Sequence, residues 1–170
     1  MTNINSPLTL ILGGARSGKT RHAEDLIKAL PAPWIYVATA EIWDEEMRAR
    51  VERHKSDRSE AGWITVEAPL DLAAALNTNT PVLVDCLTLW VTNLMLGGHD
   101  LEAAFDRLEA ALAMRTAPTF LVANEVGLGI VPDNKMARDF RDHAGRLHQR
   151  LAQKADHVIL MVAGLPLAVK

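Results

Sequence analysis

Short apolar runs rich in β-branched residues recur along the chain, with room for a helix between consecutive runs. They span residues 8–12, 34–38, 81–85, 119–123 and 157–162. Runs that are apolar throughout, without polar alternation, are typical of strands buried on both faces of a sheet. We therefore predict buried strands at these positions, a further short strand at 63–67, and an antiparallel edge strand at 165–170 after the turn Gly164-Leu165-Pro166.

Segments with helical patterns separate these strands. They cover residues 19–30, 44–58, 101–114 and 134–154. Alternation of strand and helix is typical of a mostly parallel sheet with crossover helices, which predicts an α/β fold. The sequence shows no internal repeat and no linker rich in Gly, Ser or Pro, so we expect residues 1–170 to form a single domain.

Composition narrows the classes of function. The formal net charge of −3 gives no basic field of the kind that binds nucleic acid, and we expect no nucleic-acid partner. The longest apolar stretch, residues 158–169, is shorter than the ~20 residues of a membrane span, so none is expected. The single cysteine, Cys86, cannot form an internal disulfide, and a cytoplasmic location is the simpler expectation.

The clearest motif lies between the first predicted strand and the first predicted helix. Its residues match G-x-x-x-x-G-K-[ST]: Gly13, Gly14, Ala15, Arg16, Ser17, Gly18, Lys19 and Thr20. In such a loop the backbone N–H groups surround phosphate oxygens, the lysine reaches the β and γ phosphates, and the hydroxyl can bind Mg²⁺. An accidental glycine-rich turn is the alternative, but the strand-loop-helix setting favours a phosphate-binding loop.

Asp85 ends the predicted strand at 81–85. P-loop proteins place a carboxylate near Mg²⁺ at this point, so Thr20 and Asp85 are the predicted metal-binding residues, and Lys19 and Asp85 are predicted to be catalytic. The alternative is that Asp85 only caps the next helix.

A regulatory GTPase is not indicated. Such a protein needs D-x-x-G, but Thr88 stands three residues after Asp85. The guanine-binding pattern N-K-x-D is also incomplete, because Asn134 and Lys135 are followed two residues later by Ala137.

Several further blocks accompany the phosphate loop in a fixed order. They are YVATA at 36–40, DEEM at 44–47, RVERHK at 50–55, DCLT at 85–88, VTNL at 91–94, NEVG at 124–127 and GIVP at 129–132. Together they closely resemble the bifunctional adenosylcobinamide kinase and adenosylcobinamide-phosphate guanylyltransferase family of cobalamin biosynthesis, over almost the whole chain. This resemblance implies a RecA-like P-loop fold and a homo-oligomer, for which a trimer is one candidate.

The resemblance also implies two reactions. The first phosphorylates the aminopropanol hydroxyl of adenosylcobinamide, and the second transfers GMP from GTP to that phosphate. GTP is the expected nucleotide, and ATP stays open as a second donor for the first step. The implied intermediate is a guanylylated histidine, at His54 in this sequence.

The residues around His54 suit that role. A neutral imidazole nitrogen can attack an α-phosphate without first losing a proton, and on a helix Arg50 and Arg58 lie four residues either side, where they could neutralise phosphate charge. The alternative is that Met47, Val51 and His54 form the inward stripe of an amphipathic helix.

The resemblance carries weaker expectations for other residues. It suggests nucleotide contacts at Ala38, Thr39 and Ala40, which follow a strand end where ligands gather in α/β sheets. Arg58 and Glu67 are predicted to touch the guanine nucleotide, with solvated surface positions as the alternative. Glu125 could lie near the metal or cap the turn that follows it, and the sequence leaves both open.

Two rival functions remain. One is a monofunctional P-loop kinase of another small alcohol. The other is a RecA-like nucleic-acid motor, which would be expected to show a basic groove and stacking aromatics, whereas this chain is acidic and only 5% aromatic.

Overall fold

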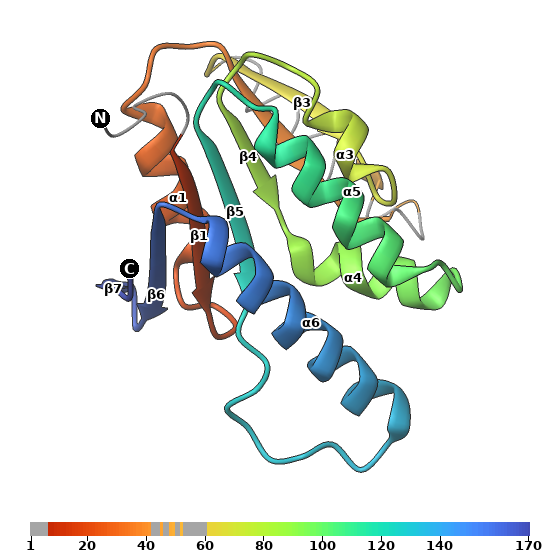
Figure 1. The fold of residues 1–170 in the computed structure, drawn as a ribbon. Coiled ribbons are helices and arrows are strands. Elements are labelled where there is room, and N and C mark those ends of the chain that lie inside the picture. Colours follow the sequence, from red (N-terminus) through yellow and green to blue (C-terminus); the bar gives the residue numbers. More distant parts are fainter. Residues whose placement is uncertain (1–6, 42–44, 46–47, 50–51, 53–60) are drawn as a thin grey trace.

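The computed structural model describes residues 7–41, 45, 48–49, 52 and 61–170. A seven-stranded sheet runs through the described part in the order β3-β2-β4-β5-β1-β6-β7 (Figure 1). Its strands are β1 (Leu8–Gly13), β2 (Trp34–Ala38), β3 (Trp63–Glu67), β4 (Val82–Asp85), β5 (Thr119–Asn124), β6 (His157–Val162) and β7 (Leu165–Ala168). Neighbouring strands are parallel except β6 and β7, which pair antiparallel. Every strand predicted from the sequence is confirmed in position, including the antiparallel edge. The prediction that the run at 157–162 is buried throughout is wrong, because His157 and Val162 at the two ends of β6 are exposed next to the short edge strand β7.

The described helices are α1 (Lys19–Lys28), α3 (Leu72–Ala75), α4 (Leu87–Leu96), α5 (Leu101–Ala113) and α6 (Lys135–Lys154). The predictions for 19–30, 101–114 and 134–154 are confirmed to within two residues at each end. Most of the predicted helix at 44–58 lies outside the described residues, although Glu45, Arg48, Ala49 and Glu52 are helical. No described helix is both long and apolar enough to cross a bilayer.

The sequence patterns did not predict α4, and its composition explains why. It buries Leu87, Trp90, Val91 and Leu94 on one side, but Leu89 and Leu96 on the exposed side are apolar as well. It packs against α5, α6 and β5. A helix with apolar residues on most sides lacks the single stripe by which an amphipathic helix is detected.

Alternation along each strand divides the core into two layers. Leu10, Val82 and Val84 pack with residues of α3, α4, α5 and α6 on one face of the sheet. Their neighbours Ile11 and Leu83 pack with Ala23 and Ile27 of α1 on the other face. Successive side chains of a strand point to opposite faces, so both faces are apolar and both carry helices. This confirms the α/β class with helices on both faces.

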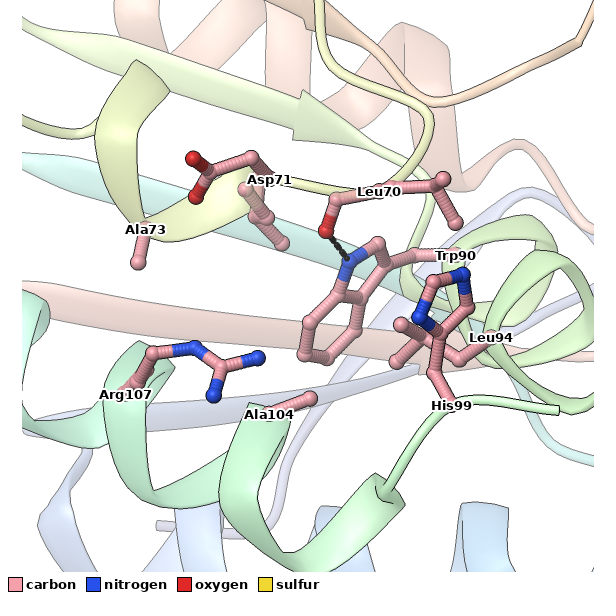
Figure 2. A pocket seen from close by; sticks show the side chains of 9 residues that line it. Leu70, Asp71, Ala73, Trp90, Leu94, His99, Ala104 and Arg107 are labelled. Atoms are coloured by element: carbon pink, nitrogen blue, oxygen red, sulfur yellow. Dashed lines mark hydrogen bonds between the residues drawn. The ribbon is translucent and has the colours of Figure 1, made fainter. Parts of the chain in front are cut away.

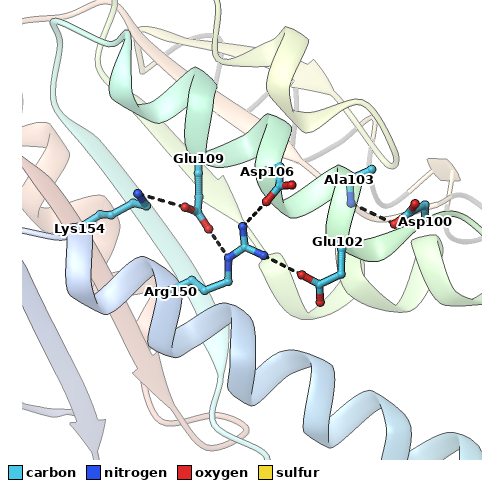
Figure 3. Close-up of polar contacts among 7 residues, drawn as sticks. All are labelled: Asp100, Glu102, Ala103, Asp106, Glu109, Arg150 and Lys154. Atoms are coloured by element: carbon cyan, nitrogen blue, oxygen red, sulfur yellow. Dashed lines mark hydrogen bonds and ion pairs between the residues drawn. The ribbon is translucent and has the colours of Figure 1, made fainter.

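Charged side chains join α5 to α6 on the outer surface (Figure 3). Arg150 of α6 binds Glu102 at 2.9 Å, Asp106 at 2.5 Å and also Glu109, while Lys154 binds Glu109 at 3.1 Å. Exposed ion pairs contribute little singly, about 0–1 kcal/mol each, but one guanidinium shared by three carboxylates fixes how the two helices align. The network lies away from the phosphate loop and stabilises the helical layer.

A second arginine, Arg115, organises the loop before β4. Its guanidinium donates to the carbonyls of Leu76, Thr78 and Thr80, each at 2.8 Å, and to the Thr119 hydroxyl. Burial lowers the pKa of Arg115 to about 10. The side chain satisfies carbonyls that a helix or strand would otherwise pair, so it is a structural residue.

Candidate functional site

The phosphate-binding motif forms the connection between β1 and α1, at the carboxyl edge of the sheet. Gly18 stands at the helix N-terminus with φ 91°, and Arg16 also has positive φ, at 55°. A Cβ on Gly13 would lie 2.5 Å from Ser17 Oγ and 2.7 Å from the Met161 carbonyl, closer than side chains tolerate. Glycine is therefore required at both ends of this turn, which leads the chain around into α1.

Lys19 points back into the loop. Its Nζ donates to the Gly14 carbonyl at 2.6 Å and lies 3.5 Å from Ser17 Oγ. The side chain is buried, and this burial lowers the pKa of Lys19, while Cys86 and Asp85 act in the opposite direction. The ammonium group thus lies inside the loop, in a position from which it could reach phosphate oxygens.

Asp85 lies directly opposite the start of α1. Its Oδ2 accepts hydrogen bonds from Thr20 Oγ1 at 2.9 Å and from the Tyr36 hydroxyl at 2.7 Å. The next helix, α4, takes Cys86 as its N-cap rather than Asp85, so the helix-cap alternative does not describe this carboxylate. The structure thus brings together Thr20 and Asp85, the two residues predicted to bind the metal.

This oxygen pair fits Mg²⁺. The ion binds hard oxygen ligands and in nucleotide sites usually uses one or two protein oxygens, with phosphates and waters completing its shell. Thr20 Oγ1 and the Asp85 carboxylate, at the entrance of the phosphate loop, are ligands of that kind.

The residues at the end of β2 and just after it hold that strand against the start of α4. The Thr39 side chain is fully buried; its hydroxyl donates to the Cys86 carbonyl at 2.7 Å and accepts from the Cys86 amide at 2.9 Å. Asn93 of α4 donates to the carbonyls of Thr39 and Pro69. Ala38 pairs with Asp85 across β2 and β4, and Ala40 is half-buried just beyond. These contacts fix the strand end that carries Asp85.

The end of β5 lies beside the phosphate loop. The Glu125 amide donates to the Gly13 carbonyl at 2.9 Å, and the Asn124 amide donates to Thr88 Oγ1 at 2.7 Å. The Glu125 carboxylate accepts from the amides of Gly127, at 2.6 Å, and Leu128, at 3.2 Å. Of the two alternatives for Glu125, the structure shows the turn cap.

Glu67 lies farther away. It ends β3, and β2, β4 and β5 separate that strand from β1. With about 4.8 Å between strands, Glu67 lies roughly 19 Å across the sheet from the loop. A nucleotide that touches Glu67 would therefore lie along β2 and β3. His54 and Arg58 fall outside the described residues.

Sequence reasoning missed three contacts around the site. Tyr36 belongs to the quoted YVATA block, but nothing in the block indicated that its hydroxyl reaches Asp85. In the sequence Thr88 marks only the absence of a switch glycine, and nothing there indicates that its hydroxyl accepts from the Asn124 amide. Gly164, in the β6–β7 turn, donates its amide to the Ser17 carbonyl at 3.1 Å. This last contact joins residues far apart in sequence, so no local pattern indicates it.

A separate cavity of about 360 Å³ lies between α3, α4 and α5 (Figure 2). Trp90 forms part of its wall and donates through Nε1 to the Leu70 carbonyl at 2.8 Å. Arg107 and His99 point toward the same space from α5 and from the turn before it (Figure 2). No residue of the phosphate loop lines this cavity.

Comparisons with known proteins agree with this geometry. A family model described as cobinamide kinase / cobinamide phosphate guanyltransferase matches residues 9–169. The bifunctional adenosylcobalamin biosynthesis protein CobU of Salmonella typhimurium is 45% identical, over 96% of this chain and 99% of its own. The corresponding protein CobP of Pseudomonas aeruginosa is 44% identical, over 95% and 96% of the two chains.

A solved structure supports the fold. An ATPase from the type III secretion system of pathogenic bacteria superposes with a TM-score of 0.56 at 11% identity, over 96% of this chain and 57% of the ATPase chain. At that identity the likeness concerns the RecA-like P-loop fold alone, and it confirms the predicted fold. The nearly full-length family match decides the rest: the chain belongs to the cobinamide kinase / cobinamide phosphate guanyltransferase family.

Proposed function

We propose that this chain catalyses both reactions of its family: phosphorylation of adenosylcobinamide on its aminopropanol hydroxyl, then transfer of GMP from GTP to the new phosphate. The observation that carries the proposal is the arrangement at the end of β1. There Lys19 lies in the phosphate loop, and Thr20 and Asp85 share a hydrogen bond beside it. That arrangement suits a nucleoside triphosphate with its γ-phosphate toward β4.

In the kinase step, the acceptor hydroxyl oxygen attacks the γ-phosphorus. The bond between that phosphorus and the β–γ bridging oxygen breaks, a nucleoside diphosphate leaves, and the hydroxyl proton is released. Lys19 and the N-terminus of α1 stabilise the negative charge on the phosphate oxygens. Mg²⁺, held by Thr20 and Asp85, would supply further positive charge when bound.

In the transfer step, a nitrogen of His54 attacks the α-phosphorus of GTP. A P–N bond forms and pyrophosphate leaves. A phosphate oxygen of adenosylcobinamide phosphate then attacks the same phosphorus, and the P–N bond breaks to regenerate the imidazole. His54 enters this proposal through the family resemblance, with Arg58 and Glu67 as the residues that contact the guanine nucleotide.

The remaining expectations concern the setting. We propose GTP as the nucleotide of the transfer step, with ATP or GTP as phosphoryl donor. We further propose a homo-oligomer, with a trimer as the first form to test, and a cytoplasmic location, consistent with the single thiol of Cys86.

Labelling with α-³²P GTP and Mg²⁺, in the absence of corrinoid, tests this proposal. The wild-type chain should acquire acid-labile, base-stable label and release one pyrophosphate per labelled chain. His54→Ala should lose the label and GMP transfer but keep substantial phosphorylation of adenosylcobinamide. His99→Ala, which changes an exposed histidine of a turn, is the matched control and should keep both activities.

Two results would decide against the proposal. Label on the His54→Ala chain would remove His54 as the nucleophile. A wild-type chain that phosphorylates adenosylcobinamide but neither takes up label nor releases pyrophosphate would be the monofunctional kinase instead.

A further inference from the structure

The positions of the phosphate-loop residues fix the side from which an acceptor approaches. β4 and β5 lie on one side of β1, whereas β6 and β7 lie on the other. Thr20 and Asp85, which would hold Mg²⁺ beside the terminal phosphate, are joined by a hydrogen bond of 2.9 Å on the β4 side of the loop. An acceptor attacks the γ-phosphorus roughly in line with the leaving oxygen, and so from beyond that phosphate. The acceptor therefore lies toward β4, β5 and the elements that follow them.

One of those elements is the connection from β5 to α6, residues 125–134, which extends beyond the carboxyl edge of the sheet (Figure 1). It starts beside the loop, where the Glu125 amide binds the Gly13 carbonyl. Its apolar side chains face solvent: Leu128 is 84% exposed and Ile130 is 97% exposed. Large apolar side chains this exposed, next to a catalytic site, indicate a surface that another molecule covers.

The connection leads to a cavity of about 310 Å³ between α4 and the first turns of α6. We call it the α4–α6 groove; it is lined by Thr92, Met95, Leu96, Asn134, Met136, Ala137 and Phe140. Leu96 and Met136 are 58% and 56% exposed on its opposite walls. The lining is almost wholly apolar, which distinguishes it from the cavity near Arg107 and His99.

The groove lies within reach of the phosphate loop. Thr88, near the start of α4, binds the Asn124 amide, and Asn124 pairs with Gly13 across β5 and β1. From Thr88 to Thr92 and Leu96 is one to two turns of helix, about 6–12 Å at 1.5 Å per residue. A ligand in the groove could thus extend one arm back to the γ-phosphate.

Two polar side chains in the lining match amide-bearing ligands. Thr92 donates its hydroxyl to the Thr88 carbonyl at 3.0 Å and keeps oxygen lone pairs for an incoming N–H. Asn134 accepts from the Ala137 amide through Oδ1, and no partner for its Nδ2 is found within the described part of the chain. The groove therefore offers an acceptor and a donor within an apolar surface.

We propose that the α4–α6 groove and the 125–134 connection bind the corrin ring of the acceptor, with its aminopropanol arm directed at the phosphate loop. This rests on the proposed function, which supplies a corrinoid as the acceptor. A corrin ring presents apolar edges and amide side arms, as this lining requires.

Met136→Asp and, from the other wall, Leu96→Asp test the proposal, because each puts a charge where the apolar ring would lie. Each should weaken equilibrium binding of cobinamide, followed by corrin absorbance, and raise KM for adenosylcobinamide by roughly 10- to 100-fold. GTP affinity and labelling by α-³²P GTP should not change. Met114→Asp is the matched control, because Met114 is 82% exposed at the end of α5 and lies outside the groove.

Each other outcome has a definite meaning. Unchanged cobinamide affinity in both groove variants would overturn the proposal. A change of oligomeric mass in light scattering, caused by the groove variants and not by Met114→Asp, would show that a second copy covers this surface, and would overturn it too. A wild-type chain that binds cobinamide through the groove but transfers neither group would support the groove and contradict the proposed function. A wild-type chain that does not bind cobinamide would overturn both.

Discussion

Tyr36→Phe should weaken metal-dependent nucleotide binding without disturbing the fold. Tyr36 is buried on β2, and its hydroxyl reaches Asp85 at the end of the neighbouring strand. The ring packs edge-on against Trp63 with centroids 6.0 Å apart, a contact that phenylalanine keeps. Removing one oxygen while retaining volume changes little in packing. The substitution therefore removes the hydrogen bond from the Tyr36 hydroxyl to Asp85 and keeps the ring contact with Trp63.

The size of the effect follows from the bonds to Asp85. A hydrogen bond to a charged group contributes about 1.5–3 kcal/mol. Thr20 still donates to the same Oδ2 at 2.9 Å in the variant, so the carboxylate keeps part of its orientation. We expect a loss of about 1–2 kcal/mol in binding of the metal–nucleotide complex, which corresponds to roughly 5- to 30-fold weaker affinity.

The assay titrates Mg²⁺ into enzyme and a fluorescent GTP analogue without corrinoid, and repeats the titration with Mn²⁺ by electron paramagnetic resonance. Tripolyphosphate binding without metal should be unchanged. In a double-mutant cycle, Tyr36→Phe should add almost nothing once Asp85→Asn is present, because both changes act through the same carboxylate. An equal loss for metal-free tripolyphosphate, or a full effect in the Asp85→Asn background, would refute the reasoning.

Three further predictions follow from single side chains. Lys19→Ala should abolish both reactions, because the loop loses the cation that lies within it; unchanged kinase turnover would contradict this. Arg115→Met should cost about 3–5 kcal/mol, since three loop carbonyls lose their donor, and lower the melting temperature by about 10 °C in calorimetry. Burial lowers the pKa of His148, opposed by Glu125, so below pH ~6.5 the unfolded chain binds more protons and stability falls as pH falls. His148→Gln should flatten the decline in melting temperature from about pH 7 to 5; an unchanged slope would exclude His148 as its source.

The sequence predicted most of the fold because the strands between helices are apolar throughout. Runs such as Thr119–Asn124 are buried on both faces, and the structure places them at the predicted positions. The predictions failed where a helix shows no contrast between an apolar side and a polar side, or where it is very short. Helix α4 has apolar residues on most of its sides, and α3 is only four residues long. The first therefore shows no single apolar stripe in the sequence, and the second is too short for a helical period to be recognised.

The candidate site was predictable where a motif is local. The loop that contains Lys19 and Thr20 is continuous in sequence, and Asp85 could be paired with it because strand ends meet at one edge of a parallel sheet. Tyr36 was not predictable, because its role depends on β2 lying next to β4, a neighbour relation that appears only in the sheet order. The predictions for Arg58 and His54 remain predictions.

The position of β1 has a consequence for how the chain folds. β1 lies between β5 and β6, so the strand that leads into the phosphate loop pairs with segments more than 100 residues later in the sequence, and Ser17 pairs with Gly164. Pairings of such long sequence separation form slowly, because loop closure must precede them. Helices α1 and α6 can form from local contacts before the loop has its final shape. Nucleotide binding is then acquired near the end of folding, and a bound nucleotide selectively stabilises chains that have completed it.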